Sequence, residues 1–140
     1  MVSFQAEVLL PGPAVAAEAL VLTAPISFWG GVDPRTGEIA DSRHPQFAQK
    51  ISGRALLVPA TVGSSSAAAI LLELVQAGLA PAAIVLHEPD AILLLGLIVA
   101  REMSIPIPIA LRLDRHQFAH FQNQRVTISS EGMIEIAKQG

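Results

Sequence analysis

The sequence predicts an α/β fold in which a small parallel sheet carries helices and an added β layer. The middle of the 140-residue chain reads strand–helix–strand–helix–strand, the order that is typical of parallel βαβ units. Short stretches with strand character lie on both sides of this middle part, and the last two surround a turn-forming SSEG segment. Neither a linker nor an internal repeat divides the sequence, so one domain over residues 1–140 is expected.

The strand predictions rest on short apolar runs between turn-forming residues. The first two, 6–10 (AEVLL) and 18–23 (EALVLT), are separated by a breaker-rich PGPA. The next two, 54–60 (RALLVPA) and 82–88 (AAIVLHE), are almost continuously apolar, as buried parallel strands are. The run 105–113 (IPIPIALRL) is also predicted as a strand, with prolines that suit a sheet edge or a strand start.

Two helices are predicted between these strands. Apolar residues recur at helical spacing over 66–77, and Gly78 suits the position just after a helix. Pro89 and Asp90 open a second helix that extends to about residue 103, with Asp90 as its N-cap. The run AILLLGLIVA in this helix has about half the length of a membrane span, so it is interpreted as a buried helix.

A long irregular stretch, PISFWGGVDPRTGEIADSRHP at 25–45, joins the second and third predicted strands. It contains a Gly-Gly pair, a DPRTG turn and a closing proline. Loops of this length in a compact domain are usually functional or form interfaces. Phe28 and Trp29 stand beside the two glycines and either fill the core beneath the loop or face a partner.

The composition predicts an unusually apolar surface. Hydrophobic residues make up 51% of the chain and charged residues 15%, whereas about a quarter of an ordinary soluble domain is charged. Part of this surface is therefore expected to be covered by a partner protein. The net charge of −3 gives no basic footprint, so nucleic acid is not an expected partner. No signal peptide or membrane-spanning run is recognised, and a cytoplasmic location without membrane association is expected.

Three consecutive serines, Ser64, Ser65 and Ser66, follow Gly63 where a strand is expected to turn into a helix. The first N–H groups of a helix lack partners and its dipole places partial positive charge there, so this point suits an anion. Either one serine caps the helix and the others are solvated, or the cluster takes part in chemistry. A P-loop lysine and a G-x-S-x-G elbow are both absent, which disfavours a phosphate-binding loop and a stand-alone serine hydrolase.

The remaining polar residues give weaker signals. His87 is interpreted as a strand-end residue with satisfied hydrogen bonds, and Glu88 beside it as a surface group. His116 and His120 have the spacing of a metal-binding pair, but their segment, RHQFAHFQNQ, is interpreted as solvated surface. The absence of cysteine excludes disulfides, thiolate nucleophiles and cysteine-bound metal within this chain, and no metal site is expected in it.

The long loop motif, the GSSS before an apolar helix and EPDAILLLGLIVARE lie in this order within about residues 18–110. Together they resemble the small, swivelling subunit of aconitase X. The resemblance implies the swivelling β/β/α fold of the small domain of aconitase-superfamily proteins. It also implies a hydro-lyase in two parts, a large subunit with an iron–sulfur cluster and most substrate contacts, and a small part that brings a catalytic serine.

By this resemblance the serine directly after the glycine, Ser64, is the general base. Ser65 and Ser66 would support the turn, start the helix and contact the substrate, and Ala67 stands where the family often has glycine. The family's substrates are cis-3-hydroxy-L-proline in bacteria and mevalonate 5-phosphate in archaea, both with a hydroxyl β to a carboxylate. Seven arginines against two lysines favour a bacterial protein, and hence hydroxyproline.

Dehydration of a β-hydroxy acid needs a base for the proton beside the carboxylate and a Lewis acid for the departing hydroxyl. A chain without cysteine lacks the usual ligands of an iron–sulfur cluster, so the cluster is expected in the large subunit. A helix terminus stabilises a nearby anion by about 0.3–2 kcal/mol, which lowers the pKa of a serine hydroxyl only slightly. The chain by itself is therefore expected to be inactive. The alternative is a non-catalytic anion-binding or interaction module with the same fold.

Overall fold

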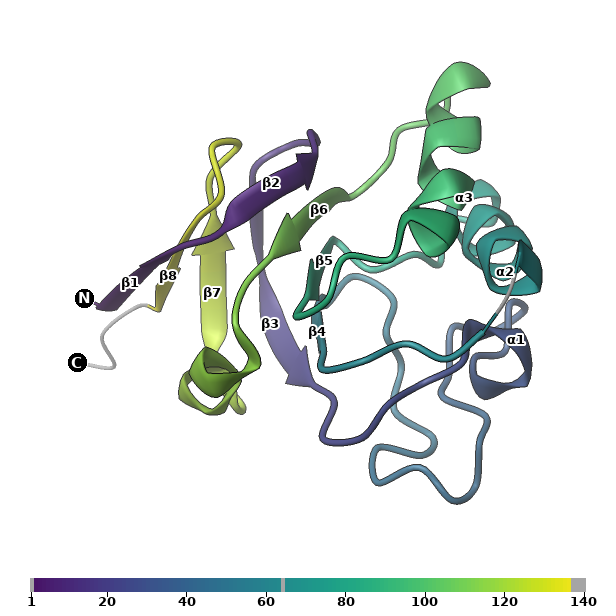
Figure 1. The fold of residues 1–140 in the computed structure, drawn as a ribbon, viewed down its shortest axis with the longest axis horizontal. Coiled ribbons are helices and arrows are strands. Elements are labelled where there is room, and N and C mark those ends of the chain that lie inside the picture. The colour runs from purple at the N-terminus through teal and green to yellow at the C-terminus, as the bar shows by residue number, and fades with distance from the viewer. Residues whose placement is uncertain (1, 64, 137–140) are drawn as a thin grey trace.

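The computed structural model describes residues 2–63 and 65–136. Within them, an eight-stranded sheet has the order β1-β8-β7-β3-β4-β5-β6-β2 (Figure 1). The strands are β1 (Val2–Gln5), β2 (Glu7–Leu10), β3 (Val15–Val21), β4 (Ala55–Val58), β5 (Ala83–Leu86), β6 (Ile109–Arg112), β7 (Arg125–Ile128) and β8 (Met133–Ile136). The helices are α1 (Phe28–Gly31), α2 (Ser65–Gln76), α3 (Ala91–Glu102) and the 3₁₀ helix η1 (Arg115–Phe121).

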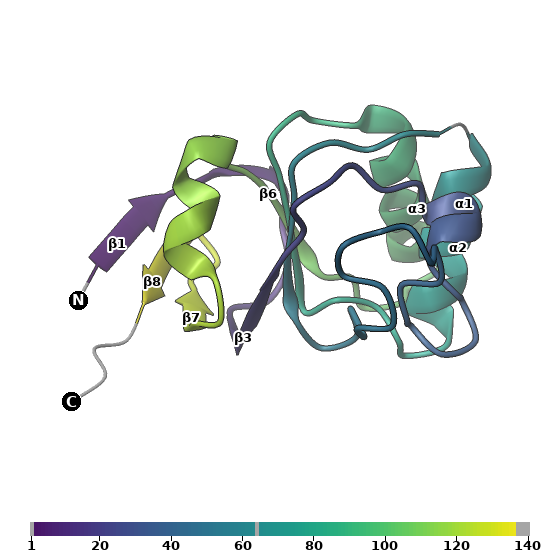
Figure 2. The same cartoon turned by 90° about the horizontal axis from the view of Figure 1, so that it is seen from below.

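The middle of the chain forms the predicted parallel unit. Strands β3, β4, β5 and β6 pair in parallel, and α2 and α3 make the two later crossovers and pack together on one face of the sheet (Figures 1 and 2). Alternation along the strands separates two cores, as β4 shows. Leu56 and Val58 face the helices, whereas Ala55 and Leu57 join the second core on the other side of the sheet.

One extended N-terminal segment joins the two ends of the sheet. Only Ala6 separates β1 from β2, yet β1 pairs antiparallel with β8 and β2 pairs antiparallel with β6. Ala6 itself is buried, and its N–H donates to the carbonyl of Gly132 at 2.9 Å. The sheet is thus nearly closed into a barrel. Sequence analysis missed β1 because its partner lies more than a hundred residues away.

The second core is closed by η1, so the RHQFAHFQNQ segment is not solvated on every side. Phe118 and Phe121 are both buried there, because residues three apart share one face of a 3₁₀ helix. The Phe121 ring meets Phe4 of β1 edge-on, with 4.9 Å between the ring centroids. The segment is therefore amphipathic: its two phenylalanines join the core, whereas most of its polar residues, among them His116 and His120, are exposed as predicted.

The helix boundaries agree with the sequence analysis to within a residue or two, but the burial of α3 does not. Gly78 adopts a φ of +73° after α2, and the side chain of Asp90 accepts from the N–H of Leu93 as the predicted cap. The inner residues of α3 are buried, whereas its outer residues Leu95 and Val99 are not. The interpretation of a buried helix is wrong because α3 lies in an outer layer that covers the sheet from one side only. None of the helices in the described residues is long and apolar enough to cross a membrane.

The loop between β3 and β4 is irregular, as predicted, but isolated bridges and backbone hydrogen bonds connect its parts. Isolated bridges join Val32 to Ile39 and Glu38 to Lys50. The predicted DPRTG turn is present, since the N–H of Gly37 donates to the carbonyl of Asp33 at 2.8 Å. Gly37 has a φ of +76°, and a Cβ there would collide with the hydroxyl of Ser52, so only glycine fits.

Candidate functional site

The residues on both sides of Ser64 lie at the carboxyl edge of the parallel strands. We define the serine turn as residues 61–63 and 65–66, between β4 and the first turn of α2. The residues that follow β3 and β5 lie at the same edge, because the strands are parallel. In open α/β sheets this edge is where ligands usually bind. The fold thus places the serine turn where a substrate is expected.

The predicted site serines begin α2. Ser65 and Ser66 are the first two residues of the helix, with Ser65 exposed and Ser66 partly buried. Ser64, the predicted general base, lies outside the described residues. The dipole of α2 adds partial positive charge at this end of the helix. This arrangement suits a carboxylate or a phosphate.

The long loop approaches the serine turn at Gly63. Its φ of +148° favours glycine, and a Cβ there would lie 3.5 Å from the Ser27 hydroxyl and 3.4 Å from the Cβ of Ala67. Ser27 in turn donates to the carbonyl of Trp29 at 3.0 Å. The two motifs that the sequence analysis singled out are therefore neighbours in space. Ser27 was not predicted as a site residue, and no local signal in the sequence distinguishes it.

A parallel bridge extends the sheet into the site. The N–H of Ile26 donates to the carbonyl of Ala60 at 3.1 Å, and the N–H of Val62 donates to the carbonyl of Ile26 at 2.9 Å. The segment after β3 therefore runs beside the segment after β4 up to the serine turn. Backbone pairing of this kind holds the turn in one position.

A side-chain hydrogen bond connects the serine turn to the start of α3. The hydroxyl of Thr61 donates to Asp90 Oδ2 at 2.6 Å, while Asp90 Oδ1 accepts from the N–H of Leu93 at 3.0 Å. Both carboxylate oxygens thus have partners. The sequence predicted Asp90 as a cap, but its bond to Thr61 depends on the fold and was missed.

The later part of the long loop is fastened to the end of β3. His44 is buried, its Nδ1 accepts from the N–H of Gln46 at 3.0 Å, and its Nε2 lies 3.2 Å from the carbonyl of Ala24. Because Nδ1 accepts, Nε2 carries the proton and donates. The amide of Gln46 also pairs with Thr23, accepting from its N–H at 2.9 Å and donating to its hydroxyl at 3.0 Å. Sequence analysis did not single out either residue.

The other three histidines each contact neighbouring residues of the fold. His87 Nδ1 accepts from the N–H of Arg115 at 3.0 Å and its carbonyl accepts from Arg112 Nε at 3.0 Å, which confirms its interpretation as a strand-end residue. His116 pairs with Asp114 at 2.7 Å, and the ring of His120 lies 5.2 Å from that of Phe4.

The residues 2–63 and 65–136 include no group of three or more His, Asp or Glu side chains that could hold a metal ion. At the serine turn they offer hydroxyls, a helix start and an engaged carboxylate. These groups can hold an anion and exchange a proton, but they provide no electrophile for a leaving hydroxyl.

Two exposed apolar side chains stand beside the site. Trp29 is 63% exposed and Val62, within the serine turn, is 60% exposed. Phe28, by contrast, is buried in the core that faces the helices. Of the two aromatics of the loop motif, Phe28 thus fills the core, whereas Trp29 is exposed, and its contact with a partner stays a prediction.

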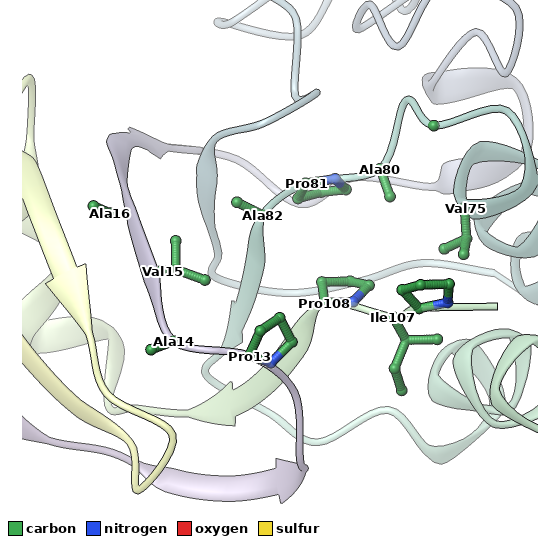
Figure 3. Close-up of a pocket in the computed structure, with 12 residues that line it drawn as sticks. Pro13, Ala14, Val15, Ala16, Val75, Ala80, Pro81, Ala82, Ile107 and Pro108 are labelled. Carbon is green, nitrogen blue, oxygen red and sulfur yellow. The ribbon is translucent and has the colours of Figure 1, made fainter. Parts of the chain in front are cut away.

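A hollow of about 440 Å³ at the opposite edge of the sheet has a different character (Figure 3). It lies where β3, β5 and β6 begin, and prolines and small apolar residues line it, among them Pro13, Pro81 and Pro108. No titratable side chain lines it, so it lacks groups for acid–base chemistry.

The family model of the aconitase X swivel domain matches residues 3–136. The chain belongs to this family. The crystal structure of Thermococcus kodakaraensis aconitase X in its holo-form aligns with this swivel domain at a TM-score of 0.84 and 26% identity, covering 99% of this chain and 100% of that one. The predicted family and its swivelling β/β/α fold are confirmed.

Curated relatives of this swivel domain are dehydratases or their small subunits. A cis-3-hydroxy-L-proline dehydratase of Pseudomonas aeruginosa is 48% identical over 109 residues, which are 73% of this chain and 19% of that protein. A phosphomevalonate dehydratase small subunit of Methanosarcina mazei is 35% identical over 123 residues, 88% of this chain and 83% of that one. The swivel domain therefore corresponds to about a fifth of the P. aeruginosa dehydratase and to most of the M. mazei subunit.

Proposed function

We propose that this swivel domain is the small part of an aconitase-X-type hydro-lyase that removes water from a β-hydroxy acid. The observation that carries the proposal is the meeting of the two family motifs, where Ser27 of the loop lies beside Gly63 of the serine turn at the start of α2. Membership in the aconitase X swivel-domain family and the dehydratase names of the relatives support it.

In this proposal Ser64 is the general base. It takes the proton from the carbon beside the substrate carboxylate, the carbon–oxygen bond on the next carbon breaks, and a carbon–carbon double bond forms. The proton and the hydroxyl that are removed together make up the one water lost. General-base catalysis of such a step typically contributes about 10²–10⁴-fold in rate. Ser65 and Ser66 bind the substrate, and the partial positive charge at the start of α2 favours its anionic group.

The proposal requires a partner. The chain has no cysteine, and its described residues include no cluster of metal ligands, so they do not fit an iron–sulfur cluster. We therefore place the cluster in a large subunit, together with most of the substrate contacts. Without that partner the described site offers only helix-terminus polarity to stabilise a serine anion, which is too little for catalysis, and the chain alone is inactive.

Among β-hydroxy acids, cis-3-hydroxy-L-proline is the favoured substrate and mevalonate 5-phosphate the next. The P. aeruginosa relative, named for the first acid, is 48% identical, compared with 44% and 35% for two small subunits named for the second, from Methanopyrus kandleri and M. mazei. The excess of arginine over lysine points the same way. Because both acids carry the hydroxyl β to the carboxylate, Ser64 has the same task with either.

The test is co-expression of this chain with the aconitase-X-type large subunit of its own organism. The purified complex is assayed for loss of water from each of the two acids, and each part is assayed alone. We expect turnover of one acid by the complex and none by either part. A stable complex that dehydrates neither acid would favour the non-catalytic module instead.

A further inference from the structure

The outer face of α3 is exposed and apolar from the start of the helix to Val99, before the exposed charges of Arg101 and Glu102. We define this face as Ile92, Leu95 and Val99 together with Met103, the C-cap of the helix. They are between 38% and 52% exposed and follow one another at helical spacing. The sequence AILLLGLIVA has no polar side chain before Arg101. By contrast, α2 beside it exposes Glu73 and Gln76.

A helix with an apolar outer side is unusual at a surface that faces water. A surface helix of a globular protein normally carries polar residues on its outer side, and a helix that is hydrophobic all round is normally buried. The inner residues of α3, including Leu93 and Leu97, already fill the core against the sheet. The outer face of α3 therefore has the character of a surface that another protein covers.

A hollow in this surface is suited to an apolar side chain. It has a volume of about 190 Å³ and lies between α2 and α3. Gly96 and Ala68 both line it, and the two helices approach so closely there that a Cβ on Gly96 would collide with the Ala68 carbonyl. The residues that line the hollow are all apolar: Ala68, Ala69, Leu72, Leu95, Gly96 and Val99.

The outer face of α3 is connected to the serine turn. Thr61 and Asp90 are joined by their 2.6 Å hydrogen bond, and exposed apolar residues follow each of them in the sequence. Val62 comes directly after Thr61, and Ile92 lies two residues after Asp90. The hydrogen bond thus places the start of α3, which carries Ile92, beside the serine turn, which carries Val62.

The area that a stable interface buries also indicates a contact larger than the serine turn. Specific interfaces bury about 800 Å² on each side, roughly a tenth of the surface of a small protein. The surface of this chain is 7044 Å², and the exposed apolar residues at the serine turn are few. Since such interfaces usually involve about 20–30 residues on each side, a stable contact has to extend well beyond Trp29 and Val62, and the exposed apolar side chains of α3 are available for it.

We propose that the outer face of α3 is the docking surface for the large subunit, with the hollow between α2 and α3 receiving one of its apolar side chains. The inference rests on the proposed function, because it takes as its partner the protein that completes the serine site. It goes further by assigning the contact to a helix face that carries no catalytic group.

The experiment measures the affinity of the purified large subunit for the swivel domain by calorimetry. The variants are Leu95→Glu and Val99→Glu, and the matched control is Val2→Glu, because Val2 is 53% exposed and lies in β1 at the far side of the molecule (Figure 1). Each variant is first shown by circular dichroism and thermal melting to be folded. For a variant that fails to fold, the milder Leu95→Ser replaces it.

We expect the α3 variants to bind at least about tenfold more weakly, as loss of a central apolar contact usually causes. At saturating concentration they should restore wild-type turnover, and Val2→Glu should bind normally. Equal affinity of folded α3 variants and wild type would overturn the inference. So would a wild-type homodimer that the α3 variants dissociate, because the face would then bind a second copy. Failure of the wild-type domain to bind the large subunit at all would instead contradict the proposed function.

Discussion

The hydroxyl of Thr61 donates to Asp90 at 2.6 Å, and the same carboxylate caps α3 by accepting from the N–H of Leu93. One carboxylate thus holds together the serine turn and the start of the neighbouring helix. Because Thr61 lies three residues before Ser64, this bond supports the segment that presents the proposed base.

Replacement of Thr61 by valine tests this connection. Valine keeps the shape of the side chain but leaves a partly buried carboxylate with one donor fewer, so the free energy of unfolding should fall by about 1–3 kcal/mol. Thr61→Ser keeps the hydroxyl and should lose less. Urea unfolding of the isolated domain measures both. Equal stabilities of the valine and serine variants would show that the hydrogen bond contributes nothing.

Gly63 is expected to be intolerant of a side chain for backbone reasons. Its φ of +148° is strained for alanine, at a cost of about 1–3 kcal/mol, although the neighbours of a new Cβ lie at ordinary contact distances. Relief of this strain should move the serine turn, so Gly63→Ala should also lower turnover of the two-part enzyme. Gly53→Ala is the control, since Gly53 has a φ of +69° and open space around it. Turnover unchanged in Gly63→Ala would mean that the turn tolerates another conformation.

The two loop aromatics should respond differently to truncation. Phe28 is 1% exposed, so Phe28→Ala should cost about 3–5 kcal/mol of unfolding free energy. Trp29 is exposed, so Trp29→Ala should leave the melting temperature of the domain nearly unchanged but weaken its binding to the large subunit. Melting curves and calorimetric titration separate the two effects. A Trp29→Ala domain that binds as tightly as wild type would place Trp29 outside the interface.

Acid stability should depend on Asp114. Its pKa is lowered by a hydrogen bond from the N–H of His116, and further by the hydrogen bond from the His116 ring. The unfolded chain therefore binds the proton more readily, and the stabilising contribution is present above about pH 4 and lost as the pH falls through the lowered folded-state pKa. Asp114→Asn should flatten the fall in melting temperature below pH 4. An unchanged pH profile in that variant would assign the acid sensitivity to other carboxylates.

Local patterns in the sequence predicted much of this fold. The apolar spacing before Gly78, the capping role of Asp90 and the DPRTG turn depend on neighbours a few residues away, and the structure confirms each of them. The parallel order of the middle strands follows from the alternation of strands and helices. The family resemblance added the swivelling β/β/α fold, which the family model and the aligned aconitase X structure confirm.

The features that sequence analysis missed depend on distant partners. Strand β1 exists because β8 pairs with it, and η1 is folded inward because Phe121 meets Phe4. At the site, the bond from Thr61 to Asp90 and the contact of His44 with Ala24 join residues that are 29 and 20 positions apart. The spacing of apolar residues along the sequence does not indicate which distant residues come into contact. The role of Ser64 remains a prediction, because that residue lies outside the described ones.

Turnover of the two-part enzyme carrying Ser64→Ala tests the central proposal most directly. We predict a loss of about 10²–10⁴-fold in kcat, with assembly and substrate binding retained, because the substitution removes the base and little else. Ser65→Ala and Ser66→Ala should raise KM more than they lower kcat. Near-normal turnover in Ser64→Ala, with Ser65→Ala abolishing it, would move the base to Ser65. Full activity of all three variants would contradict a catalytic role for the serine turn.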